Sequence, residues 1–516
     1  MLILISCLLL FITALVLLVL QVTQPNARYA WLVAVGGALL ALASVFIWLV
    51  QMPFELNLPA WQPRSVFLSP ILFRADRLSW PFSLSITALT LTILLTAITR
   101  SAITNSVTWA GTLAVCGIGI LAVTAENPLT LLLVWGALDL MELITQLRSV
   151  KGSANSERVV VSFSTRAIGI GLLLWANILS IAKGITFDFQ SIAPEAGLYL
   201  VAAAGLRLGV FPLHLPYSTE ETLRRGIGTS LRLVSAVASL TLLVHIPHES
   251  LTSTLTPFLL GLAVITALYG SWMWLRAPEE LTGRPYWIIS LAAFSVISAL
   301  SGSSLGVVAW GCALILVGGS LFLASAQNVW VDRALLIGMW SLSSLPFSLT
   351  ASAWLGNLGL FIPFVIVAQS LLMAGFARQV LRSVGRTTFD EQPGWANKIY
   401  PVGLILLIIF QPVLGLVGWD GALQVGAWLQ ALITTALGLG LVWATPRLRI
   451  LNPVRAHWVG PAISGVSSAY GSLWVIYRFL GRISQAITAT LEGEGGIMWT
   501  LLLLILFISL VIHGTP

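Results

Sequence analysis

The sequence predicts an all-α, polytopic membrane protein of about 14 to 16 transmembrane helices. Of its 516 residues, 58% are hydrophobic and only 9% are charged, and its mean hydropathy is +0.95. Soluble domains of this size do not have such a composition. The apolar residues fall in windows of about twenty, the length of helix that crosses the hydrocarbon core of a bilayer. Lysine and arginine are concentrated in alternate loops between these windows, as the positive-inside rule requires.

About sixteen windows are candidate spans. The first has no basic residue at its start and no small-residue cleavage site before Gln21, so it is predicted to be a span rather than a signal peptide. The twelfth is interrupted by Pro346, because proline removes a backbone donor from the helix. The windows cover residues 1–21, 29–51, 79–99, 107–124, 128–147, 160–182, 196–212, 227–246, 255–275, 286–302, 305–326, 333–352, 358–381, 399–418, 423–444 and 497–513.

The loop charges predict the orientation. Of the 26 lysine and arginine residues, 19 lie in odd-numbered loops or at the window ends that border them, four lie in even-numbered loops and three lie well inside spans. The three inside spans are Arg166, Arg207 and Arg232. This bias predicts cytoplasmic odd loops, with both termini on the outer side of the cell inner (plasma) membrane.

Two segments are predicted not to span the membrane. Residues 51–77 are rich in proline and aromatic residues, which indicates an ordered loop on the outer face. Residues 463–491 alternate apolar positions with Arg478, Arg482 and Gln485, a pattern typical of an amphipathic helix on the membrane surface or against a partner.

The composition argues against several classes of protein. The three cysteines and five histidines are scattered, so no thiolate cluster or His/Cys pair predicts a metal site or a redox cofactor. The net charge of +7 follows the loops rather than forming a basic patch, so we expect no nucleic-acid partner. Bound cofactors and metals are therefore expected to be absent.

The seventh span ends in a stretch whose charged residue and prolines are unfavourable in a membrane helix. Residues 205–216 read Gly-Leu-Arg-Leu-Gly-Val-Phe-Pro-Leu-His-Leu-Pro and contain Arg207, Pro212 and His214. A guanidinium at membrane depth costs at least a few kcal/mol. Hydrocarbon tolerates a proline break only where protein or water satisfies the freed backbone groups. The stretch predicts an ion-handling break in a transmembrane helix, or the remnant of one.

Several motifs together resemble one family, the antiporter-like membrane subunits shared by respiratory complex I, membrane-bound hydrogenases and multisubunit Na⁺/H⁺ antiporters. The likeness is greatest to the large, terminal subunit and covers roughly residues 70–445. The spacing of Arg207, Pro212 and His214 is similar to the family's Lys-x₄-Pro-x-His pattern. The other similar motifs lie at residues 72–79, 126–135, 320–325 and 345–348.

The resemblance implies two five-helix repeats of inverted topology, each with a discontinuous helix near the midplane, and Pro212 and Pro346 fit such breaks. It divides the chain into N-terminal spans with the outer-face loop, a first repeat, a second and degenerate repeat, and C-terminal spans with the amphipathic helix. The corresponding residues are 1–105, 106–250, 251–385 and 386–516.

In this family, proton translocation is attributed to a glutamate in the fifth span and to lysines in later spans. The ungapped position of the glutamate is Gly136, and one helical turn further the chain has Asp139, followed by Glu142 after another three residues. These acids and Gln146 share one helix face because they lie at positions i, i+3 and i+7. They are interpreted as partners of Arg207; the alternative is a solvated pair near a helix end, or one paired with Arg148.

Arginine stands where the family has lysine or histidine in the seventh and eighth spans, at Arg207 and Arg232. The change is not conservative, because arginine keeps its proton at any accessible pH. The two arginines are expected to bind a carboxylate or to supply a fixed positive electrostatic field. The alternative is that their side chains extend to the cytoplasmic interface of the membrane. His214 is either a structural histidine or a proton donor.

The second half has lost the family's lysines. Their positions fall at Gly318 and near Trp354, and a chain of protonatable groups cannot be assembled there. Ordered water could follow the hydroxyl groups of Ser341, Ser343, Ser344, Ser348 and Thr350.

These observations predict a membrane subunit of a complex I-like assembly, of the NADH-quinone oxidoreductase or hydrogenase type. It would contribute to proton translocation driven by redox chemistry in other subunits, and it would not itself be the redox catalyst. Its partners would be sister membrane subunits and the bilayer. The alternatives are a non-pumping structural subunit of the same fold, which the missing lysines favour, and a component of a cation/proton antiporter or inorganic-anion transporter.

Overall fold

The computed structural model describes residues 1–444, apart from 25–28, 59–69, 101–105, 150–152, 186–188, 190, 216–224, 252–253, 327–328, 383–393, 420–421 and 425. The chain divides into two compact units, Met1–Arg449 and Ile450–Pro516, and every described residue lies in the first. The predicted surface helix at 463–491 and the span at 497–513 therefore lie outside the described residues.

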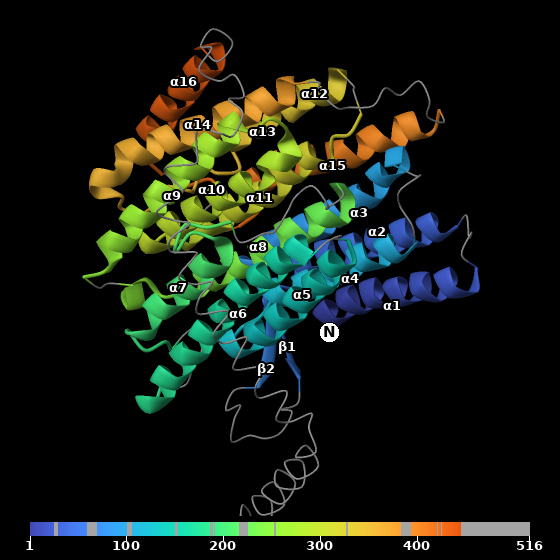
Figure 1. Cartoon of the computed structure of the whole chain (residues 1–516), viewed down its shortest axis with the longest axis horizontal. Helices are drawn as coiled ribbons and strands as arrows, with labels where there is room; N and C mark the ends of the chain where they lie inside the picture. The colour runs from blue at the N-terminus through green and yellow to red at the C-terminus, as the bar shows by residue number, and fades with distance from the viewer. Residues whose placement is uncertain are drawn as a thin grey trace, which may run out of the picture. The chain divides into compact units, whose positions relative to one another are not determined.

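The helices reproduce the predicted windows in order along the chain (Figure 1). The first eight are α1 Leu2–Thr23, α2 Ala30–Gln51, α3 Ser79–Thr96, α4 Ser106–Val123, α5 Pro128–Ser149, α6 Ser153–Ala182, α7 Ala196–Leu208 and α8 Arg225–His245. The rest are α9 Thr256–Arg276, α10 Glu280–Leu300, α11 Ser304–Leu323, α12 Val329–Leu335, α13 Ile337–Ser341, α14 Ile362–Leu381, α15 Ala396–Val417 and α16 Trp428–Ala444. Short 3₁₀ turns are η1 Ala97–Arg100, η3 His248–Leu251 and η4 Gly359–Phe361.

Twelve helices within the described part of the chain are long and apolar enough to cross a membrane, and the shorter apolar helices α7 and α16 join them. The prediction of a polytopic, multi-pass helical membrane protein is thereby confirmed. The predicted twelfth span is broken: α13 ends at Ser341, and no helix resumes until η4. Ser344 and Phe347 have positive φ angles of 57° and 64° on either side of Pro346, a conformation that a continuing helix excludes.

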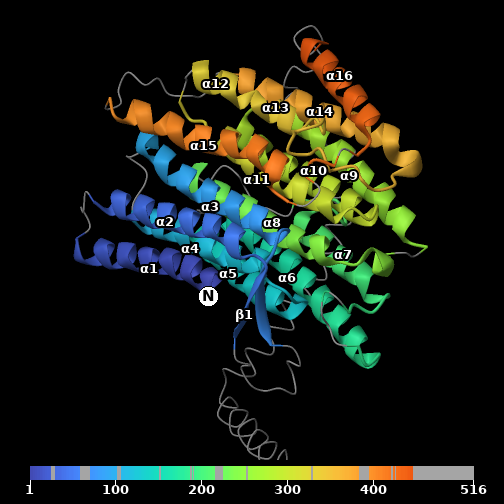
Figure 2. The same cartoon turned by 180° about the vertical axis from the view of Figure 1, so that it is seen from behind.

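The predicted outer-face loop contains a β-hairpin that the all-α prediction did not include. Strand β1, Phe54–Leu58, pairs with the antiparallel strand β2, Ile71–Ala75. Alternate apolar residues on both strands suit a ribbon with one packed face. Phe73 also forms a bridge to Ala125, before α5. Figure 2 shows the hairpin at one end of the helices, beyond α5.

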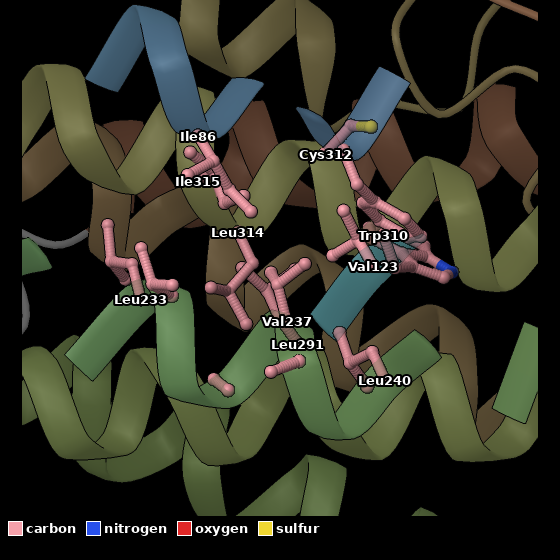
Figure 3. Packing of buried hydrophobic residues seen from close by; sticks show 14 of the residues in the cluster. Ile86, Val123, Leu233, Val237, Leu240, Leu291, Trp310, Cys312, Leu314 and Ile315 are labelled. Atoms are coloured by element: carbon pink, nitrogen blue, oxygen red, sulfur yellow. The ribbon is translucent and has the colours of Figure 1, made fainter. Parts of the chain in front are cut away.

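Helix α8 is the central element of the described unit. It packs against α3, α4, α5, α7, α10 and α11, and 94% of its spanning window is buried, against 33% for the peripheral helix α1. Arg232, Ser235 and Ser239 of α8 bond to residues of α5 and α7, and an apolar stripe of the same helix packs toward α10 and α11. Figure 3 shows the apolar stripe with its partners, namely Leu233, Val237 and Leu240 of α8, Leu291 of α10, and Leu314 and Ile315 of α11.

Candidate functional site: a buried chain of arginines and carboxylates

Helix α5 presents two carboxylates and an amide on one face. Asp139, Glu142 and Gln146 follow the i, i+3, i+7 spacing, and each is at most 2% exposed. The alternative of solvated carboxylates near a helix end is wrong for this structure, since Arg148 is exposed and the acids are not. Burying an ionised carboxylate is costly unless it is paired with an opposite charge. The groups that bind Asp139 and Glu142 therefore determine the chemistry of the site.

Asp139 is held by Arg207 from α7. Arg207 Nη1 donates to Asp139 Oδ2 at 2.7 Å, and Nη2 donates to Oδ1 at 3.0 Å, which is the bidentate geometry that guanidinium and carboxylate prefer. Arg207 Nε donates to Ser239 Oγ of α8 at 3.2 Å. The guanidinium also lies 4.2 Å from the ring centroid of Trp135, whose own Nε1 is fixed by the Ala238 carbonyl. Arg207 is therefore held in one position by contacts with α5 and α8.

Glu142 is held by two arginines from different helices. Arg166 of α6 donates to its Oε2, and Arg232 of α8 donates to its Oε1. Gln146 donates to Oε1 as well, and Ser235 Oγ donates to Oε2 at 3.3 Å. Both carboxylate oxygens of Glu142 thus accept from charged and neutral donors.

Arg166 connects the two carboxylates. Its Nη1 lies 3.6 Å from Asp139 Oδ1 in addition to its contact with Glu142. Five buried charges therefore alternate in sign in the order Arg207, Asp139, Arg166, Glu142, Arg232; we call this set the arginine–carboxylate chain. Alternation offsets the cost of removing these charges from water. Only its two carboxylates can change charge, because arginine stays protonated.

The structure brings four of the five predicted site residues together, namely Asp139, Glu142, Arg207 and Arg232. Sequence reasoning did not include Arg166 in the site. A signal was present, because Arg166 is one of only three basic residues inside the predicted spans. Its partner could not be inferred, because the acids on α5 lie on a different helix.

His214 lies apart, in the turn that follows α7. Gly209 ends the helix with a φ of 77°, and the Gly205 carbonyl accepts from the backbone amides that follow. His214 Nδ1 lies 2.7 Å from the Pro212 carbonyl oxygen, which can only accept, so this nitrogen carries the proton. The imidazole thus stabilises the turn.

Aromatic side chains fill the positions where the family resemblance implies lysines in the second half. A Cβ on Gly318 would lie 2.5 Å from Trp287 Nε1, so the glycine makes room for the indole. Trp287 packs against Trp274, Phe322 and Phe376. Trp354 belongs to a second cluster, with Phe294 and Trp310.

The broken segment after α13 is held by uncharged groups. Gln369 of α14 donates to Ser344 Oγ at 2.9 Å and accepts from Trp354 Nε1 at 3.0 Å. Gln411 of α15 accepts from Ser341 Oγ at 2.8 Å. These glutamines satisfy polar groups that the break would otherwise leave unpaired in an apolar interior. The hydroxyl residues that the sequence suggested for a hydrated path are all buried here, namely Ser341, Ser343, Ser344, Ser348 and Thr350.

Within the described residues, no three His, Cys, Asp or Glu side chains lie close enough together to hold a metal ion. The two halves thus differ in chemistry. The first contains the arginine–carboxylate chain, and the second contains aromatic clusters with a neutral hydrogen-bond network around its break.

The fold is shared with chains of two multisubunit membrane complexes. The chain is similar in structure to a chain of the Mrp complex from Dietzia sp. DQ12-45-1b, with a TM-score of 0.71 at 15% identity over all of this chain and 63% of that one. It is also similar to a chain of the membrane-bound sulfane sulfur reductase, an archaeal respiratory membrane complex, with a TM-score of 0.64 at 13% identity over 98% and 99% of the two chains. The chain thus spans less than two thirds of the Mrp chain. No protein-family model and no curated protein sequence matches it.

Proposed function

We propose that this chain is a membrane subunit of a complex I-like assembly, of the quinone-reductase or hydrogenase type, and that its first half takes part in proton translocation. Redox chemistry in other subunits would supply the driving force. The similar solved structures support membership of a multisubunit membrane complex, since one is named as an Mrp complex and the other as a respiratory membrane complex. Sister membrane subunits are the partners that follow from this.

The single observation that carries the proposal is the arginine–carboxylate chain. Ionisable residues inside a membrane are costly and are usually retained for a function. Asp139 and Glu142 are the members that can accept and release a proton. The arginines stabilise the ionised carboxylates and supply a fixed positive field, which is how they replace the family's lysines in this proposal.

Proton flux into sealed vesicles tests the proposal. The full chain is reconstituted, a membrane potential is imposed, and an internal pH indicator follows proton entry. The variant Asp139→Asn/Glu142→Gln should lose the flux. The matched control is Glu195→Gln, an acid whose side chain is 66% exposed and pairs with Lys183 outside the arginine–carboxylate chain. Flux in the double variant equal to that of the parent would contradict the proposal.

A non-pumping structural subunit is the second candidate, and a specific observation favours it. Each carboxylate is engaged by two guanidinium groups that cannot give up a proton, and the described second half presents aromatic and amide groups at its break. On this alternative the arginine–carboxylate chain joins α5, α6, α7 and α8. The double variant would then lower the yield of assembled complex, while the parent chain would show no flux above that of empty vesicles.

The membrane and the orientation are part of the proposal. The loop charges favour both termini on the outer side, and we propose the cell inner membrane as the location. The proposed inverted repeats occupy residues 106–250 and 251–385, and the arginine–carboxylate chain belongs to the first. The protein would bind sister membrane subunits through its flat helical faces and through the predicted helix at 463–491.

A further inference from the structure

Arg166 lies beside both carboxylates of the arginine–carboxylate chain. Arg207 forms its ion pair with Asp139, and Arg232 forms its ion pair with Glu142. Arg166 contacts both carboxylates, and it does so with the same nitrogen, Nη1. It therefore lies at the junction of two ion pairs.

The two contacts of Arg166 are unequal. Its contact with Glu142 is a hydrogen bond, whereas 3.6 Å to Asp139 Oδ1 exceeds the range of about 2.7 to 3.2 Å for N–H···O bonds. A displacement of less than about 1 Å would convert the second contact into a hydrogen bond. Arg166 thus lies near both carboxylates and is closer to Glu142 than to Asp139.

The surroundings keep Arg166 between these partners. Its backbone carbonyl accepts from Arg207 Nη1 at 3.3 Å, which ties the residue to the other end of the arginine–carboxylate chain. Further along α6, Gly169 lies so close to Arg207 that a Cβ there would be 2.6 Å from Arg207 Cγ. The close packing of α6 and α7 holds the guanidinium of Arg166 beside both acids.

We propose that Arg166 is a positioning residue shared by Asp139 and Glu142. When Glu142 loses its charge, the guanidinium of Arg166 moves from Glu142 to Asp139. Because a guanidinium stays charged, a neutral Glu142 leaves Arg166 without its main counter-charge, and Asp139 is within reach of the same nitrogen. The state of one carboxylate is thereby transmitted to the other. The importance of this exchange for proton transport rests on the proposed function. The exchange of partners by Arg166 does not depend on that function.

The structure of a Glu142→Gln variant of the full chain tests the exchange directly. Arg166 Nη1 should then lie within about 3.2 Å of an Asp139 oxygen, at hydrogen-bond distance. The matched control is Gln146→Ala, which removes a neutral donor to Glu142 but leaves its charge, so Arg166 should stay on Glu142. If Glu142→Gln does not fold, Asp139→Asn provides the reciprocal test, with Arg166 bonded to Glu142 alone. The proposal is overturned if Arg166 keeps its place in Glu142→Gln, or leaves Glu142 in Asp139→Asn.

Proton flux separates a positioning role from a merely structural one. Arg166→Gln should reduce the flux by about tenfold or more, because a hydrogen bond between charged groups corresponds to at least a factor of ten. Arg166→Lys should restore part of it, since an ammonium retains the charge that either acid can bind. Unchanged flux in a folded Arg166→Gln variant counts against the role. Absence of flux in the parent refutes the proposed function instead, and the structural comparison still decides whether Arg166 exchanges partners.

Discussion

Replacing Arg207 with glutamine should strongly destabilise the first half of the protein. The bidentate pair with Asp139 places two unit charges about 4 Å apart, where they attract by about 4 kcal/mol at an effective dielectric constant of about 20. Removing one partner of such a pair also leaves the other charge buried, and losses of about 3–5 kcal/mol are typical. The free energy of unfolding should fall by that amount.

The assay is a titration of the full chain with SDS in mixed micelles, with tryptophan fluorescence as the signal. Arg148→Gln is the control, because Arg148 is exposed and its loss should cost less than about 0.5 kcal/mol. A second variant, Asp139→Asn combined with Arg207→Gln, should lose less than the sum of the two single losses, by about 1–3 kcal/mol, because no unpaired charge remains. A near-neutral Arg207→Gln, or additive single losses, would refute this account of the ion pair.

Three further predictions follow from the packing and from the loop charges. Gly169→Ala should lower the free energy of unfolding by about 1–3 kcal/mol in the same titration, because the added Cβ would lie 2.6 Å from Arg207 Cγ. An unchanged free energy of unfolding would mean that the Arg207 side chain moves aside without cost. Gly318→Lys should lower the thermal stability in detergent, since Trp287 occupies the space, and adding Trp287→Gly should recover part of the loss; no recovery would refute the proposed steric cause. A reporter fused after Arg386 should lie on the cytoplasmic side, and a signal from the outer side would overturn the proposed orientation.

The predicted elements agree with the structure where a prediction depends only on residues close together in the sequence. Each apolar window between α1 and α11 coincides with a helix, because length and hydropathy alone decide whether a segment can cross a bilayer. Pro346 likewise predicted the break after α13, because proline lacks the backbone N–H that a continuing helix needs. The β-hairpin was missed because β1 and β2 are separated by residues 59–70, and their pairing is a contact between segments rather than a property of either.

The candidate site was only partly predictable for the same reason. The spacing of Asp139 and Glu142 placed both acids on one face of α5, since helical periodicity is fixed within a few residues. Arg166 had no such signal: it lies 24 residues from Glu142 and on a different helix. A basic residue inside a span reveals that it needs a partner, but not which acid provides it.

The sequence by itself indicated that this protein is a helical membrane protein, roughly where its spans from α1 to α16 lie, where two of its helices break, and that Arg166, Arg207, Arg232 and two acids lie within those spans. Each of these follows from hydropathy, proline chemistry or helical spacing over short stretches. Only the tertiary structure decided that Arg207 binds Asp139 across 68 residues, that Arg232 binds Glu142 across 90, and that Trp287 fills the space beside Gly318. Those outcomes depend on how separate helices pack against α5 and α8, because a buried charge is stabilised only by groups that the fold brings within bonding distance.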